Sequence, residues 1–156
     1  MTFPSWHTLL GPLPDAAVPE RRPVGSPEVL ARPEGAAIAG WDQLMLHLSA
    51  GEAGLRTILV VLDAEDRLVS ASDLALYRSE RPDGAADLTQ DSVGGRFEPD
   101  GSFRGTRWHG TAVERPGEDE SEWQLAKSEP SEADVEQLRA LVAEVLRRGP
   151  ARGASC

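Results

Sequence analysis

The sequence predicts an α+β fold: an antiparallel sheet of four to five strands with an N-terminal and a C-terminal helix packed on one face. Two observations support this class. The middle of the chain holds short runs rich in β-branched and aromatic residues, separated by turn residues. Segments with helical periodicity flank these runs on both sides. If the sheet is strongly curved, it closes over the C-terminal helix as a cone with a pocket.

A proline-rich arm, residues 1–35, precedes this domain. It contains seven of the twelve prolines of the chain. Each proline fixes φ and removes a backbone donor, so neither a regular helix nor a central strand is expected. The first dozen residues also contain apolar side chains, such as Phe3 and Trp6, which a solvated linker does not need. We therefore expect an extended arm that packs on its own domain or on a second subunit.

A single α+β domain is predicted over residues 36–149, and residues 150–156 are expected to be a disordered tail. The first element of the domain is a helix over residues 40–50. Its apolar residues follow the helical spacing i, i+3, i+4, i+7: Trp41, Leu44, Met45 and Leu48. Gly51 and Gly54 are suitable residues to end it.

The next elements are extended. Residues 56–62 are apolar and β-branched, which predicts a strand, and a polar turn at 63–66 leads into a return strand over 68–77. An alternative for the second half of this segment is a short helix capped by Ser72 or Asp73. Residues 123–127 are interpreted as one more strand.

Residues 91–113 are predicted to form a hairpin, because Pro99, Asp100 and Gly101 supply the residues of a tight turn. If Phe97 faces Phe103 across the turn, alternation places Arg107 and His109 on the same face as the two rings, and Gly95 lies opposite Gly105. A slip of one residue would regroup all of these side chains. Facing glycines leave room for a ligand or, as we prefer, mark a bulge or a curved strand.

The C-terminal helix carries the clearest signals. Ser131 is an N-cap with Asp134 three residues later, and Gly149 and Pro150 end the helix. Between them the apolar residues form one face that must be buried against the sheet: Val135, Leu138, Leu141, Val142, Val145 and Leu146.

Composition excludes several classes of function. The net charge of −10 disfavours nucleic acids and anionic membranes as partners. The only cysteine, Cys156, has no intramolecular partner, and no common nucleotide-binding, hydrolase or metal motif is present, so no cofactor or metal is expected.

The N-terminus lacks secretory features and no apolar run spans a bilayer, which favours the cytoplasm. Abundant arginine with a single lysine, Lys127, is typical of a GC-rich bacterial genome.

The candidate site centres on Arg107 and His109. An arginine fork suits a carboxylate or phosphate, and a histidine can transfer a proton near neutral pH. Asp91 and Tyr77 are expected nearby, and Trp108 completes the set of candidate ligand-binding residues. A purely structural role for these side chains is the alternative.

Three hypotheses for function follow from these residues. The favoured one is a small accessory protein that binds a small, anionic ligand in the concave face of its sheet with Arg107 as anchor. The second is an enzyme that uses His109 as acid or base while Arg107 orients the substrate. The third is a protein–protein interaction module or homo-oligomer that uses residues 1–35.

Overall fold

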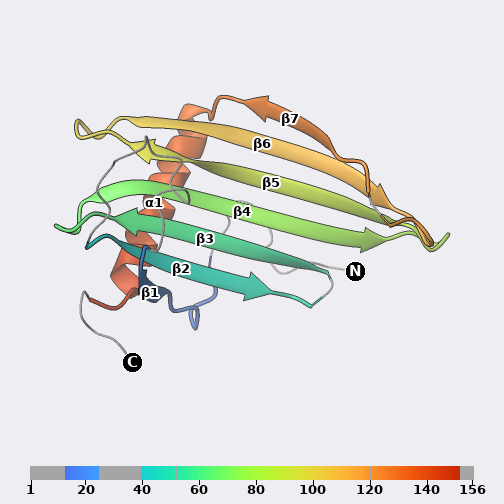
Figure 1. Ribbon diagram of the computed structural model, residues 1–156, viewed down its shortest axis with the longest axis horizontal. Coiled ribbons are helices and arrows are strands. Elements are labelled where there is room, and N and C mark those ends of the chain that lie inside the picture. The colour runs from blue at the N-terminus through green and yellow to red at the C-terminus, as the bar shows by residue number, and fades with distance from the viewer. Residues whose placement is uncertain (1–12, 25–39, 52, 120, 152–156) are drawn as a thin grey trace.

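In the part of the chain that the structure describes, seven strands form one antiparallel sheet, and one helix lies on one face of it (Figure 1). The structure is a computed structural model that describes residues 13–24, 40–51, 53–119 and 121–151. The strands are β1 (Glu20–Pro23), β2 (Asp42–Ser49), β3 (Gly54–Leu62), β4 (Leu68–Glu80), β5 (Ala86–Phe97), β6 (Phe103–Glu114) and β7 (Gln124–Ser128). Each strand pairs with its neighbours in the sequence, and the helix α1 (Glu132–Arg148) follows the last strand.

The antiparallel sheet and the C-terminal helix are confirmed, but the predicted strand number is too low. The five strands expected between residues 56 and 127 are present as β3 to β7. Two more, β1 and β2, extend the sheet on the β3 side. The additional strands come from segments that had been assigned to the arm and to the N-terminal helix.

The predicted helix over residues 40–50 is wrong, because this segment is strand β2. Leu44 and Leu46 are buried against α1 and pair with Val60 and Ile58 of β3. A period of two places Leu44, Leu46 and Leu48 on one face of a strand, whereas the helical spacing joins Leu44 and Leu48 with Trp41 and Met45 instead. Strands β1 and β3 lie on either side of β2 and form backbone hydrogen bonds with it. These hydrogen bonds make this segment a strand despite its helical spacing.

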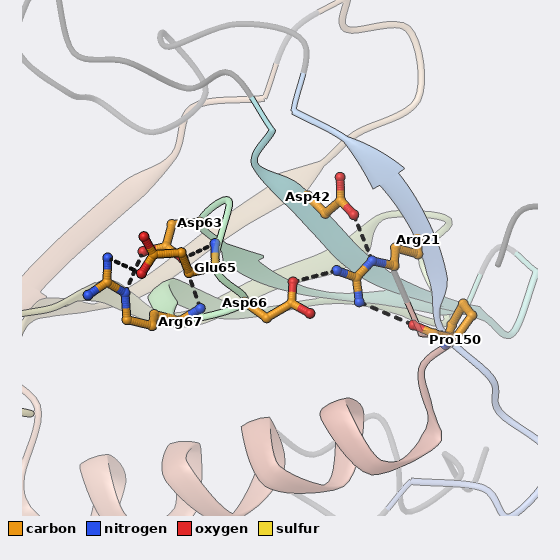
Figure 2. A network of polar contacts seen from close by, with 7 residues as sticks. All are labelled: Arg21, Asp42, Asp63, Glu65, Asp66, Arg67 and Pro150. Carbon is orange, nitrogen blue, oxygen red and sulfur yellow. Dashed lines mark hydrogen bonds and ion pairs between the residues drawn. The ribbon is translucent and has the colours of Figure 1, made fainter. Parts of the chain in front are cut away.

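One edge of the sheet is β1, which lies within the predicted arm. Pro23 is tolerated there because an edge strand leaves one side of its backbone unpaired. Arg21 connects this edge to three other parts of the chain (Figure 2). Its guanidinium donates to Asp42 at 2.7 Å, to Asp66 at 2.7 Å and to the carbonyl oxygen of Pro150 at 3.2 Å. The strand edge, the turn between β3 and β4 and the end of α1 are thereby joined.

The expected packing of the first dozen residues falls outside the described part of the chain, as does most of the expected tail. The domain limits at 35 and 149 and an oligomer formed through residues 1–35 stay predictions. Among the described residues, no helix combines the length and the apolar character that crossing a membrane requires.

The core lies between α1 and the face of the sheet that the helix crosses. Its buried members come from the helix and from four strands: Leu44, Leu46, Ile58, Val60, Leu62, Ala71, Phe97, Leu138, Leu141, Val142 and Val145. Each large aliphatic side chain buried in this way contributes about 1.5–3 kcal/mol. Gly149 makes room for this packing, since a Cβ there would lie 3.0 Å from Cδ2 of Leu44.

The predicted caps of α1 are largely confirmed. Ser131 Oγ accepts from the backbone N–H of Asp134 at 3.1 Å, and Asp134 Oδ2 accepts from the backbone N–H of Ser131 at 3.0 Å, which completes a capping box. Gly149 ends the helix in an extended conformation, with φ −73°, instead of the left-handed one that is common after helices.

Candidate functional site

The central hairpin has the predicted register, and this register defines the site. Phe97 pairs with Phe103, and their ring centroids lie 5.0 Å apart. Alternation along β6 then places Arg107 and His109 on the face of the sheet that carries α1. Both side chains are accessible, with exposed fractions of 31% for Arg107 and 55% for His109.

His109 is held by a carboxylate. Asp91, its cross-strand partner on β5, places Oδ1 2.7 Å from Nδ1 of the imidazole. An ionised carboxylate only accepts hydrogen bonds, so Nδ1 carries the proton, and in the neutral ring Nε2 is then the free acceptor. Asp91 is largely covered, with an exposed fraction of 19%, whereas His109 extends to solvent. This arrangement fixes the tautomer and the orientation of an accessible imidazole.

Arg107 is held by the first turn of α1. Its Nη1 donates to Oδ1 of Asp134 at 3.0 Å, while the second oxygen of Asp134 caps the helix at Ser131. One carboxylate therefore fixes both the helix start and the guanidinium. Among the described residues this is the one hydrogen bond of Arg107, whose guanidinium has five N–H donors. The remaining donors are available to a ligand.

The site opens at the edge of the sheet. The edge strand β7 pairs with β6 so that Ala126 lies beside His109 and Ser128 lies beside Arg107. Both side chains are small, and every residue of β7 is exposed. A molecule can therefore approach Arg107 and His109 across β7 without displacing a large side chain.

The structure does not bring Trp108 to this face. Trp108 points to the opposite face of the sheet, where its exposed fraction is 36% and Nζ of Lys127 lies 5.7 Å from the ring centroid. It is therefore separated from Arg107 and His109 by the sheet itself. The cation beside it is Lys127, which pairs with Trp108 across β6 and β7.

Tyr77 lies one strand farther from His109 than Asp91 does. It lies on β4, two strands away from His109, and its cross-strand partner on β5 is Thr89 and not Asp91. Tyr77 instead contributes to a separate cavity of about 210 Å³ that Leu76 and Trp123 also line. Of the predicted neighbours of His109, Asp91 is thus its cross-strand partner, whereas Tyr77 lies one strand farther away.

The two facing glycines provide no hollow for a ligand. Gly95 and Gly105 are cross-strand partners, as expected. A Cβ on Gly95 would lie 2.2 Å from the carbonyl oxygen of Arg104, and one on Gly105 would lie 2.5 Å from the ring of Phe103. The space is filled by backbone and by this ring, so close approach explains the glycines.

Sequence reasoning missed the roles of three charged groups on the same face. Asp134 was identified as a helix cap but not as the partner of Arg107. Arg56 and Asp73 form an ion pair that is fully buried, with exposed fractions of 0% for both side chains. The sequence does carry a signal for Asp73, because an aspartate stands between Ala71 and Ala75 on the core side of an alternating strand.

The described residues contain no group of three or more His, Cys, Asp or Glu side chains that could hold a metal ion. The comparisons with known proteins add no assignment: no protein-family model matches the chain, and no similar protein was found among curated proteins or solved structures.

Proposed function

We propose that the protein binds a small anionic molecule, with a carboxylate or phosphate group, at Arg107 and His109. One observation carries this proposal. The guanidinium of Arg107 and the imidazole of His109 are both accessible and lie side by side on one face of β6, and each is oriented by its own carboxylate. A guanidinium with free donors forms paired hydrogen bonds with a planar carboxylate or with phosphate oxygens.

The ligand approaches from the β7 edge in this proposal. Asp134 occupies one Nη1 hydrogen of Arg107, and the ligand takes the N–H groups that remain. His109, with Nδ1 committed to Asp91, presents Nε2. A protonated imidazole can also donate from Nε2 to the same anion.

The test is a screen of small carboxylates and phosphates by thermal unfolding, followed by calorimetric titration of the compounds that stabilise the protein. Arg107→Ala is expected to abolish stabilisation by those compounds. Arg104→Ala is the matched control, because Arg104 lies on the same strand, faces the opposite side and has an exposed fraction of 83%. A screen in which no anion stabilises the protein, or equal losses in the two variants, contradicts the proposal.

Arg107→Lys separates binding from stability. Lysine keeps a charge that can reach Asp134 but lacks the planar fork, so ligand affinity is expected to fall while the melting temperature without ligand changes little. The opposite result, an unchanged affinity with a lower melting temperature, assigns Arg107 to the stability of the helix start alone.

The contact of Asp91 with His109 favours a second candidate, an enzyme with His109 as acid or base. A carboxylate on Nδ1 is the arrangement that orients a catalytic imidazole. The test is hydrolysis of a panel of activated esters and phosphate esters with His109→Gln and Asp91→Asn. The control is His47→Gln, because His47 is also exposed and bonds through Nδ1 to Thr57 Oγ1 at 2.9 Å. A reaction that all variants retain rules this candidate out.

A further inference from the structure

The cavity that Tyr77, Leu76 and Trp123 line lies on the face of the sheet opposite α1. It has a volume of about 210 Å³, and its walls include Leu55 of β3, Leu76 of β4 and Leu88 of β5. Leu55 and Leu76 are cross-strand partners, and alternation along the three strands points these side chains away from the helix. Trp123, from the segment before β7, closes another side. The lining is therefore mainly aliphatic and aromatic.

Glycines keep this cavity open and place its tryptophan. Gly51 and Gly54 form part of the wall without side chains, and Gly51 adopts φ +64° with nothing within 4 Å of the position of a Cβ. On β6, a Cβ at Gly110 would lie 3.3 Å from Cε3 of Trp123 and 2.4 Å from Cδ2 of Leu125. The bare backbone at Gly110 thus lets both side chains lie against the sheet.

The charged side chain at the wall is already paired and therefore attracts anions weakly. Arg78 is the cation that lines the cavity, and its guanidinium is bound by two carboxylates. Nη1 donates to Glu80 at 2.9 Å, and Nη2 and Nε donate to Glu114 at 2.9 and 3.3 Å. Both carboxylates lie outside the cavity lining and already accept from the guanidinium, so Arg78 offers little attraction to a ligand with a carboxylate.

We propose that this cavity binds a small, uncharged and mainly apolar molecule of the size of one substituted aromatic ring. An enclosed cavity of about 150 Å³ with aliphatic and aromatic walls holds benzene; the cavity here is open to solvent on one side, and its volume has room for a ring with small substituents. Trp123 supplies a flat surface for the ring, and the leucines of β3, β4 and β5 supply aliphatic contacts. The ligand class and the face of the sheet both differ from those of the anion site at Arg107.

The test is titration of the full chain with toluene and p-cresol, with benzoate as the charged counterpart, followed by NMR of leucine methyl groups. We expect saturable shifts for the leucines of the cavity, with toluene and p-cresol binding more tightly than benzoate. Leu76→Phe fills the cavity and is expected to weaken binding by about tenfold or more, which is about 1.4 kcal/mol. Leu74→Phe is the matched control on the same strand and face, outside the cavity lining, and should leave affinity unchanged.

A second variant covers the case in which Leu76→Phe does not fold. Trp123→Ala removes an exposed ring (37%), so folding is expected to persist while affinity for toluene and p-cresol falls. Arg107→Ala should keep the affinity for toluene, which distinguishes this site from the anion site. The proposal is overturned by the absence of saturable shifts, by equal losses in Leu74→Phe and Leu76→Phe, or by benzoate binding as tightly as toluene.

Discussion

Arg56 and Asp73 meet as a doubly hydrogen-bonded ion pair from which solvent is completely excluded. Nε of Arg56 donates to Oδ1 at 2.8 Å and Nη2 donates to Oδ2 at 2.6 Å, and both side chains have an exposed fraction of 0%. They come from the adjacent strands β3 and β4, on the face that carries α1. Because each charge loses its hydration on burial, the two groups are stable there only as a matched unit.

Removing one partner of this pair should be more damaging than removing both. Asp73→Ala leaves the guanidinium of Arg56 buried without its carboxylate, and we expect the free energy of unfolding to fall by about 3–5 kcal/mol. The double variant Arg56→Met/Asp73→Leu places apolar groups of similar size in the same space and should lose less. Urea denaturation of the two variants measures the difference. A double variant less stable than Asp73→Ala would contradict this account.

Asp134 competes with any anion for Arg107, so neutralising it should strengthen binding of an anionic ligand. Asp134→Asn keeps an oxygen that can accept from the N–H of Ser131, but it removes the negative charge 3.0 Å from Nη1 of Arg107. We expect a lower Kd by calorimetry, with a loss of helix stability of about 0.5–1 kcal/mol from the weakened cap. Glu136→Gln makes the same change of charge on an exposed position of α1, and an equal gain there would assign the effect to net charge.

Gly95 should tolerate no side chain. A Cβ would lie 2.2 Å from the carbonyl oxygen of Arg104 and 2.4 Å from Cα of Gly105, and these are backbone atoms that move only if β5 and β6 separate. We therefore expect Gly95→Ala to lower the free energy of unfolding by about 1–3 kcal/mol. Ser92→Ala, on the same strand, is the control and should change stability little. Thermal unfolding of the two variants decides the matter, and an unaltered melting point for Gly95→Ala would refute the steric argument.

The hairpin shows how much local sequence can predict. The Pro99-Asp100-Gly101 turn and the two phenylalanines determine the register, and the register alone brings Asp91 beside His109. The helix caps are equally local, because Ser131 and Asp134 satisfy each other within one turn. These features were predictable because every residue that determines them lies close by in the sequence.

Other features depend on distant residues. Residues 42–49 are apolar at spacings that fit a helix and a strand, and only the pairing with β1 and β3 selects the strand. The contacts of Arg107 with Asp134 and of Arg56 with Asp73 join residues 27 and 17 positions apart. No periodicity in the sequence specifies which arginine meets which aspartate, so the partners of both arginines emerge only from the fold.

Glu144 should contribute to stability at neutral pH and lose that contribution in acid. Hydrogen bonds from Arg147 and Arg148 lower the pKa of its carboxyl from 4.5 to about 2. In the unfolded chain the carboxyl takes up its proton near the ordinary value, so the folded state gains from the ionised form above about pH 4.5 and loses this gain as the pH falls toward 2. Arg148 also donates to the carbonyl oxygens of Pro14 and Ala17, so Glu144 helps to hold that segment against the helix end.

The measurement is the urea midpoint of the natural sequence and of Glu144→Gln at several pH values between 7 and 2. Glutamine cannot ionise, so the variant should be less stable at pH 7, and the gap between the two proteins should narrow below pH 4.5 and nearly close at pH 2. Glu136→Gln, on the same helix and also exposed, separates this effect from the general response to acid. If the gap between the natural protein and Glu144→Gln stays constant over the whole range, the two arginines do not stabilise the ionised carboxylate in the folded chain, and Arg148 holds residues 14–17 without help from Glu144.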